Sequence, residues 1–354
     1  VIPLDISARL GWSLTKKRSL NLTLSSYGRQ YGGKFYDILN AIRIWLSYHF
    51  VWKKNWQANL LNADLCFIGG GKLIMDNHLD FPLKLYLLSH LARRSHVPYH
   101  LFAVGVGQNW SSLGLRWMQS VVKNATTIHV RDKVSLLRIN HSFPHPNVSI
   151  VNDPALWAAE LYGYETLARQ KKVGINILNR VDFNEQRPPQ SKVTPQDWET
   201  FWINLAVALT KQGFSVEYFT NGNGLDEELA NRVWKKAITL EPTINRAKRP
   251  YKPKELARLI QNYSMVLASR LHATILAASY RIPTIGIAWD DKVTQFYNSM
   301  NCGERALILH DLNVTPLVQA LMEFNEGWDA RLLEDKKSQI IADLSRVLNN
   351  KGLD

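Results

Sequence analysis

Ser269, Arg270 and His272 place a fixed cation and a titratable imidazole where an apolar run gives way to a helical pattern. The run 265–268 predicts a buried strand, and the residues from Ala273 predict the helix that follows. At a helix start the backbone N–H groups lack partners within the helix and the dipole is positive, so an anion is favoured there. We expect Ser269 to cap this helix. A phosphorylated or carboxylated substrate would suit the arginine and the histidine. The alternative is an arginine paired with a neighbour and a histidine that caps its own helix, and these residues alone leave both interpretations open.

The elements that must position these residues alternate between strands and helices along the whole chain. Apolar runs predict strands at 64–68, 99–104, 127–130, 148–151, 173–178, 215–219, 265–268, 284–288 and 306–309. Helical patterns fall at 82–94, 111–123, 154–168, 195–211, 225–236, 252–261, 271–280, 292–300, 315–324 and 329–348. The polar stretches 184–192 and 221–224 are predicted to be loops.

Short apolar strands separated by helices are typical of parallel sheets with right-handed crossovers. The fold class we predict is therefore α/β, with two doubly wound Rossmann-like domains. We expect an N-terminal domain over residues 1–168 and a C-terminal domain over residues 169–328. A last helix within residues 329–354 is expected to pack back on the N-terminal domain.

In doubly wound folds, ligands bind beyond the carboxyl ends of the strands. Several chemically interesting residues follow predicted strands, namely Gly69, Gly70, Gly71, Arg131, Asp153, Asp291 and Lys292. Glycines there let a backbone approach a ligand closely, although tight strand-to-helix turns need glycine as well. Asp153 fits a helix cap with Pro154 at the first helical position, and that structural role alone would account for it.

The chain has 354 residues, a formal net charge of +13 and 46% hydrophobic residues, which indicates a basic globular protein. The charge favours an anionic partner, but no nucleic-acid-binding motif accompanies the basic clusters Lys16–Arg18 and Arg246–Arg249, and we expect no nucleic acid. No apolar run is long enough to span a membrane.

Neither Cys66 nor Cys302 has a metal-ligand spacing partner, and a reducing cytoplasm is the expected compartment. The first residues lack a signal-peptide pattern, and the missing initiator Met leads us to expect further sequence before Val1.

Tryptophan is abundant in the segment Ile42–Trp56, which also holds basic residues and is predicted to be a helix. One interpretation is a peripheral contact with a membrane, with tryptophan at headgroup depth and Lys and Arg on anionic lipid. The other, which we favour because the apolar face is not cleanly separated, is an ordinary buried helix.

Five segments occur in an order that resembles the polysaccharide pyruvyl transferases over about residues 60–300. They are Ile68–Gly71, Val130–Asp132 with Ser135, Asp153–Ala155, Ser269–His272 with Ala277, and Ile282–Pro283 with Asp291, Lys292 and Phe296. The family's Gly-Asn-x-Gly-Asp-like turn after its first strand is not found, and Gly28 and Gly32–Gly33 replace it poorly.

This resemblance implies transfer of the pyruvyl group of phosphoenolpyruvate to a sugar of a surface polysaccharide or its lipid-linked precursor, with release of phosphate. It implies a GT-B-like fold with the active site in the interdomain cleft, the acceptor on the N-terminal side and phosphoenolpyruvate on the C-terminal side. His272 would be the acid–base catalyst and Arg270 the clamp on phosphoenolpyruvate. Substrate contacts would come from Arg131, Ser269, Leu271, Lys292, Gly69, Gly70, Gly71, Asp153 and Asp291. No metal or cofactor is expected, the acceptor would be a saccharide or polyprenyl-linked oligosaccharide, and the enzyme would be cytoplasmic, at the inner face of the membrane.

Two other functions fit the same fold prediction. One is a GT-B glycosyltransferase that uses a nucleotide sugar, although the late segment offers Asp290 and Asp291 where such enzymes usually place a glutamate. The other is a non-catalytic glycan-binding protein, for which loss of the Arg270 and His272 pair would be expected.

Overall fold

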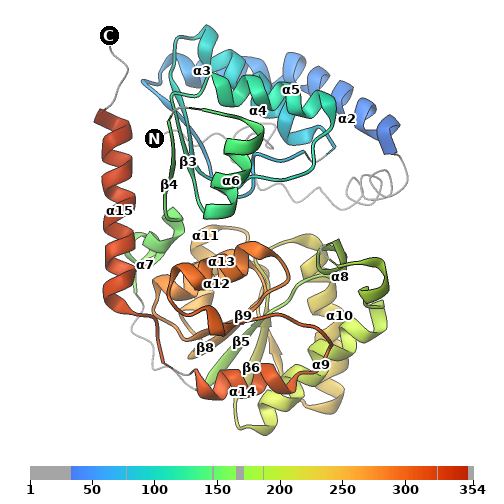
Figure 1. The fold of residues 1–354 in the computed structure, drawn as a ribbon. Coiled ribbons are helices and arrows are strands. Elements are labelled where there is room, and N and C mark those ends of the chain that lie inside the picture. The colour runs from blue at the N-terminus through green and yellow to red at the C-terminus, as the bar shows by residue number, and fades with distance from the viewer. Residues whose placement is uncertain are drawn as a thin grey trace. The chain divides into compact units, whose positions relative to one another are not determined.

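The computed structural model describes residues 33–349, apart from 77, 146, 165–170, 186 and 325. The chain divides into two compact units, one formed by residues up to Asp153 together with those from Gln339 onward, and the other by Pro154–Ser338. Figure 1 shows the strands and helices of each unit. The division falls inside the last helix, α15 (Ala330–Asn349). The cluster Lys16–Arg18 and the glycines at 28 and 32 lie outside the described residues.

The first unit contains a parallel sheet in the order β1-β2-β3-β4. Its strands are β1 (Cys66–Gly69), β2 (Tyr99–Val104), β3 (Thr127–Val130) and β4 (Val148–Ile150). Its helices are α2 (Gly33–Ser47), the π-helix η1 (Tyr48–Trp52), α3 (Lys53–Leu61), α4 (Asp80–Arg94), α5 (Ser112–Lys123) and α6 (Lys133–Ser142). Every residue of β2 is buried, as expected for a strand covered on both faces.

The second unit contains a parallel sheet in the order β10-β9-β8-β5-β6-β7. Its strands are β5 (Lys172–Asn176), β6 (Ser215–Phe219), β7 (Asn245–Arg246), β8 (Met265–Ala268), β9 (Thr284–Ile287) and β10 (Ala306–Leu307). Its longer helices are α9 (Pro195–Lys211), α10 (Gly224–Leu240), α11 (Pro253–Ile260), α12 (Leu271–Ser279), α13 (Asp291–Ser299) and α14 (Thr315–Glu323). Shorter turns of helix are η2 (Pro154–Trp157), α7 (Ala158–Tyr162), α8 (Arg180–Glu185), η3 (Pro189–Ser191) and η4 (Gly303–Arg305).

The prediction of parallel α/β sheets is confirmed, and most predicted elements lie within a few residues of those observed. Within the predicted helix at 154–168, residues 154–162 are split into η2 and α7, Gly163 ends α7 with a φ of +83°, and 165–168 lie outside the described residues. The predicted loop at 184–192 is wrong in part, because Asn184 lies in α8 and 189–191 form η3. The two-residue strand β7 was not predicted, since it is too short for an apolar pattern.

None of the described helices is long and apolar enough to cross a membrane.

Candidate functional site

The second sheet reverses its strand order between β5 and β8, which are hydrogen-bonded neighbours although β6 and β7 separate them in sequence. From β5 the chain adds strands toward one edge, and from β8 it adds them toward the other. This reversal is the point at which a doubly wound sheet opens a crevice beyond the carboxyl ends of its strands. The residues at those two strand ends are Asn176 on β5 and Ser269, which follows β8.

Asn176 joins the two strand ends through its backbone and its side chain. Its backbone carbonyl accepts a hydrogen bond from Ser269 Oγ at 2.5 Å, and its Oδ1 accepts one from the Arg270 N–H at 2.9 Å. Asn176 Nδ2 donates to Asn221 Oδ1 at 3.0 Å. Because Asn176 and Ser269 are fully buried, these contacts fix the backbone from which α12 starts.

The prediction that Ser269 caps α12 is wrong, because the capping position is Arg270 and no side chain fills it. Ser269 is still part of the approach from β8, and its hydroxyl donates to Asn176 instead. Its side chain is fully buried, so any substrate contact at Ser269 would involve its backbone.

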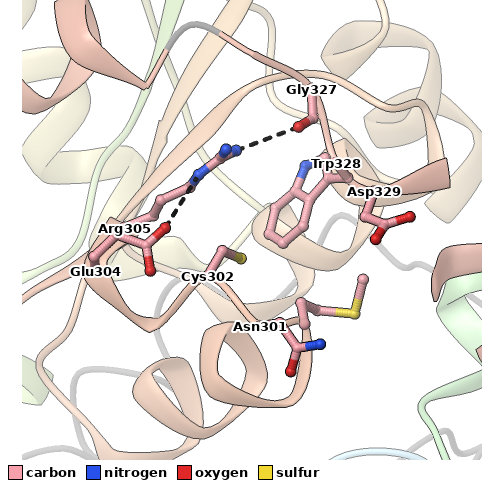
Figure 2. A pocket seen from close by; sticks show the side chains of 8 residues that line it. Asn301, Cys302, Glu304, Arg305, Gly327, Trp328 and Asp329 are labelled. Carbon is pink, nitrogen blue, oxygen red and sulfur yellow. Dashed lines mark hydrogen bonds and ion pairs between the residues drawn. The ribbon is translucent and has the colours of Figure 1, made fainter. Parts of the chain in front are cut away.

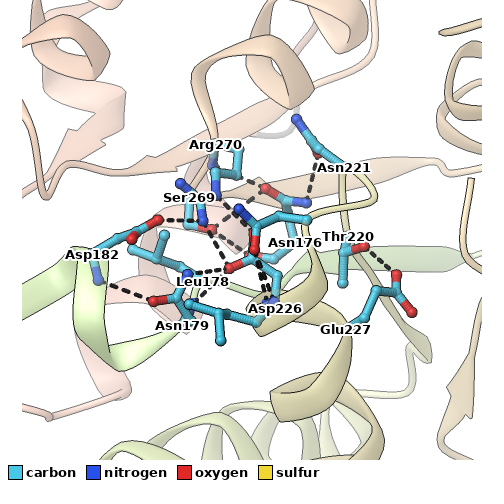
Figure 3. Close-up of polar contacts among 12 residues, drawn as sticks. Asn176, Leu178, Asn179, Asp182, Thr220, Asn221, Asp226, Glu227, Ser269 and Arg270 are labelled. Carbon is cyan, nitrogen blue, oxygen red and sulfur yellow. Dashed lines mark hydrogen bonds and ion pairs between the residues drawn. The ribbon is translucent and has the colours of Figure 1, made fainter. Parts of the chain in front are cut away.

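Arg270 holds its guanidinium between two carboxylates (Figure 3). Nε and Nη2 donate to the two oxygens of Asp226 at 2.8 and 2.7 Å, and Nη2 also lies 2.6 Å from Asp182 Oδ2. Burial alone would lower the pKa of Arg270, but the hydrogen bonds and charges of Asp226 and Asp182 outweigh burial and raise it. The arginine is therefore a permanent and oriented cation.

Asp226 is itself held on more than one side. It is fully buried in the first turn of α10, and its Oδ1 accepts hydrogen bonds from the backbone and the side-chain amide of Asn179 at 2.9 and 2.7 Å. Asn179 Oδ1 in turn accepts from the Asp182 N–H at 3.0 Å. A buried carboxylate is costly unless several donors satisfy its oxygens. The donors around Asp226 hold it in place, and Asp226 in turn fixes Arg270 in one position.

Trp289 extends the cluster to the end of β9. Its Nε1 donates to the Ser269 carbonyl at 2.6 Å. The Arg270 guanidinium and Lys292 Nζ lie 5.6 and 4.5 Å from the centroid of its ring. Lys292 also lies 3.1 Å from Asp290, whose carboxylate caps α13 by accepting from the Lys292 N–H. The structure thus brings Lys292 and Arg270 to the same indole, with exposed Asp291 beside them on the first turn of α13.

His272 is exposed on the first turn of α12, two residues after Arg270. On the same helix Leu271, Ile275 and Ala278 are all buried. Any ligand contact at Leu271 would therefore come from its backbone at the helix start.

The remaining predicted residues lie in the first unit, at the carboxyl ends of its strands. Gly70 and Gly71 have φ values of +84° and +69°, a conformation that residues with a Cβ rarely adopt. The Gly71 carbonyl accepts from the Gly105 N–H at 2.8 Å, so the turns after β1 and β2 are tied together. Gly69 ends β1 so close to β2 that a Cβ there would lie 2.5 Å from the Phe102 carbonyl oxygen.

Arg131 lies against the turn after β2. A Cβ on Gly105 would come within 2.9 Å of its guanidinium, and its Nε is 3.4 Å from Asp132. Asp132 caps α6, since its Oδ1 accepts from the Ser135 N–H at 2.6 Å. Asp153 is half-buried and follows β4 directly before η2. Arg131 and the glycines are thus brought together within the first unit, as Arg270 and Lys292 are within the second.

A pocket of about 150 Å³ in the second unit involves none of the predicted site residues (Figure 2). It is lined at the end of α13 by Met300 and Cys302 and beyond them by Arg305 and Trp328. Arg305 Nη1 donates to the Glu326 and Gly327 carbonyls at 3.0 and 3.4 Å, so its charge serves the loop before α15. The strand-end cluster, formed by Arg270, Trp289, Lys292 and their partners, adjoins the other end of α13.

Sequence reasoning missed Asn176, Asn179, Asp182, Asp226 and Trp289. Asn179 and Asp182 follow the first strand of the second unit, so attention to residues after strands could have found them. Asp226 lies 44 residues before Arg270 and is recognisable only from the folded chain.

Among the residues the structure describes, no group of three or more His, Cys, Asp or Glu side chains is arranged to hold a metal ion. Burial raises the pKa of the Cys66 and Cys302 thiols to about 11, so both are poor nucleophiles.

Comparisons with known proteins place this geometry in a wider context. A model of the family described as polysaccharide pyruvyl transferase matches residues 16–291, which contain every candidate site residue except Lys292. The UDP-GlcNAc 2-epimerase of Methanocaldococcus jannaschii has a similar structure, with a TM-score of 0.56 and 8% identity over 83% of this chain and 80% of that chain. A trehalose-6-phosphate synthase has a TM-score of 0.50 and 10% identity over 94% of this chain and 84% of that chain. These structures show that the fold is GT-B-like and carry no information on the reaction. A comparison of the sequence with curated proteins finds no match.

Proposed function

The chain belongs to the polysaccharide pyruvyl transferase family, and from that premise we propose that it transfers the pyruvyl group of phosphoenolpyruvate to a saccharide. The product is a ketal across two sugar hydroxyls, and the phosphate is released. The acceptor is a surface polysaccharide or its lipid-linked precursor, and the enzyme works in the cytoplasm at the inner face of the membrane.

The observation that carries this proposal is the oriented arginine at the strand-order reversal of the second sheet. Phosphoenolpyruvate has a phosphate and a carboxylate, so its site needs fixed cations and N–H donors. Asp226 and Asp182 occupy Nε and Nη2 of Arg270, which leaves Nη1 as the part of the guanidinium for a ligand. Lys292 and the positive end of the α12 dipole supply further positive potential around the same turn.

His272 has the chemistry to move the protons that this reaction requires. Protonation of the methylene carbon makes the neighbouring carbon an oxocarbenium-like centre, to which a sugar hydroxyl adds with loss of its proton. The bond between that carbon and the phosphate oxygen then breaks, and a second hydroxyl adds to the carbon, gives its proton to the departing phosphate and closes the ketal. An exposed imidazole beside a bound anion can give the first proton and accept the second, which suits general acid–base catalysis.

The strand ends of the first unit are proposed to contribute the acceptor contacts. Gly70 and Gly71 expose backbone to a ligand, and the turns on which they lie are tied to that of Arg131 through Gly105. Asp153 and, on the second unit, Asp291 are candidates to accept a sugar hydroxyl proton.

Phosphate release from phosphoenolpyruvate tests the assignment of His272 and Arg270. We expect His272→Ala and Arg270→Ala each to lower the rate by at least about 100-fold, because one removes an acid–base group and the other a preorganised cation. The acceptor in this assay is the lipid-linked saccharide fraction of cells that lack the protein.

The matched control is His310→Ala, an exposed histidine in the same unit that is not part of the cluster. It should turn over at the wild-type rate, and circular dichroism should show all three variants folded. Near-normal turnover by folded His272→Ala would refute its catalytic role.

Stabilisation by UDP-glucose but not by phosphoenolpyruvate in thermal unfolding would favour a nucleotide-sugar glycosyltransferase instead.

A further inference from the structure

The segment α2–η1–α3 has apolar side chains on two opposite sides. On one side Ile44, Tyr48, Trp52 and Trp56 are buried in the core of the first unit. On the other side lies an exposed apolar face that consists of Phe35, Ile38, Ile42, Leu46 and Phe50, with Leu39 and Trp45 beside them. The buried side explains why the segment is helical and attached to the unit, and it leaves the exposed face without a structural role.

The exposed face is continuous because its members recur every three or four residues along the helix. Phe50 is 81% exposed and Ile42 is 50% exposed, so no described residue covers them. Contiguous apolar surface of this kind is uncommon on a monomeric protein and marks a site of interaction.

The charges around the face select its partner. Between Gly33 and Leu61 the sequence contains one acidic residue, Asp37, and its carboxylate lies 2.7 Å from the imidazole of His78. Arg43 and Lys54 are exposed, and Lys53 is half-buried next to them. The face is thus basic as well as apolar, and the whole chain carries a net charge of +13.

We propose that the exposed face of α2–η1–α3 docks on an anionic lipid bilayer, with the helix in the plane of the interface. The apolar side chains enter the boundary between headgroups and acyl chains, and Trp45 lies at headgroup depth, where its amphipathic ring is favoured. Arg43, Lys53 and Lys54 remain among the anionic headgroups. A second copy of the chain would bring the same basic residues together, so the charges favour lipid over self-association.

Vesicle cosedimentation with the full-length chain tests this surface. The probes are vesicles of phosphatidylcholine alone and of equal parts phosphatidylcholine and phosphatidylglycerol, at low salt. We expect the chain to sediment with the anionic vesicles and not with the neutral ones, and salt should release it because exposed charges are screened. The assay needs neither phosphoenolpyruvate nor a saccharide, so its outcome is independent of the proposed function.

The double variant Ile42→Ser, Phe50→Ser removes two exposed apolar side chains and should weaken partition at least about tenfold. Lys54→Ala should weaken it about fivefold, the effect of one basic residue near an anionic surface. The matched control is Leu137→Ser, Leu240→Ser, which replaces two exposed leucines elsewhere and should bind as the wild type does.

Three results would overturn the proposal. They are no sedimentation with anionic vesicles, equal sedimentation with neutral vesicles, and equal binding by Ile42→Ser, Phe50→Ser. A lipid-free dimer that dissociates in this variant, without vesicle binding by the wild type, would assign the face to a second copy of the chain.

Discussion

The position of Arg270 in the fold was predictable from the sequence, whereas its ion-pair partners were not. Its position after β8 follows from local sequence, because an apolar run ends and a helical pattern begins there. Its partners do not, since Asp226 comes from α10 and Asp182 from α8. Of the two interpretations left open by the sequence, the structure bears out the pairing of the arginine with neighbours, and that pairing orients the guanidinium at the strand-order reversal of the second sheet.

The two carboxylates on Arg270 should differ in their contribution to stability. Asp226 is fully buried and Asp182 is about a quarter exposed. We expect Asp226→Asn to lower the free energy of unfolding by about 3 kcal/mol, because it breaks a buried ion pair and leaves Arg270 poorly compensated. Asp182→Asn should cost less than about 1 kcal/mol, as expected for a pair near solvent. Urea denaturation measures the free energy of unfolding of both variants, and an equal loss in the two would contradict the structure.

Two histidines in the first unit predict a loss of stability in acid. Thr127 Oγ1 lies 2.9 Å from His100 Nδ1 and 3.1 Å from His129 Nε2, and Ser149 Oγ lies 2.9 Å from His129 Nδ1. Burial lowers the pKa of both rings. The charge of His129 lowers the pKa of His100 further, whereas at His129 the charge of Asp343 opposes the shift and that of Arg346 adds to it. The unfolded chain then binds more protons than the folded chain below about pH 6.5.

The stabilisation from the neutral histidines is therefore complete above about pH 6.5 and is lost as the pH falls toward their lower folded-state pKa values. Urea denaturation at about pH 7.5 and about pH 5.5 should give a smaller free energy of unfolding at the lower pH. His129→Gln should reduce that difference, whereas His141→Gln, at an exposed position in α6, should leave it unchanged. A difference that is identical in His129→Gln and wild type would rule out this origin.

At the scale of elements, the sequence predicts best the buried apolar strands and a long helix that begins at a Thr-Pro pair. The predicted bounds of β2, β3, β6, β8 and α9 agree with the structure. Loops such as 184–192 were less predictable, because α8 is held by tertiary contacts of Asn184 with Val193. The π-helical turn η1 likewise has no recognised pattern in sequence.

The packing of Tyr263, between α11 and β8, against the second sheet depends on a glycine in β5. A Cβ on Gly174 would lie 2.5 Å from the ring of Tyr263, whose hydroxyl donates to Glu217 at 2.8 Å and which is fully buried. The ring has nowhere to move, so Gly174→Ala should destabilise the protein by about 1–3 kcal/mol. Gly224→Ala, which adds a methyl in open space at the start of α10, is the control and should be neutral. Equal midpoints of thermal unfolding for both variants would contradict this close packing.

At the scale of the whole molecule, α/β sheets and a GT-B-like fold were predictable because strand and helix patterns alternate throughout. The family was predictable from the order of its segments, and the family model confirms it. The exposed face of α2–η1–α3 was not separable from the buried side, because both are apolar and only the fold distinguishes them. The two proposals concern different residues: the strand ends of both units for the reaction, and a helical surface of the first unit for lipid binding.

Transfer of label from radiolabelled phosphoenolpyruvate to the saccharide fraction is the most direct test of the central claim, that this chain is a phosphoenolpyruvate-dependent ketal-forming enzyme. The wild type should place acid-labile pyruvyl label in the saccharide, and His272→Ala should do so at least about 100-fold more slowly. Absence of label from phosphoenolpyruvate, together with transfer of sugar from a labelled nucleotide sugar, would contradict the account.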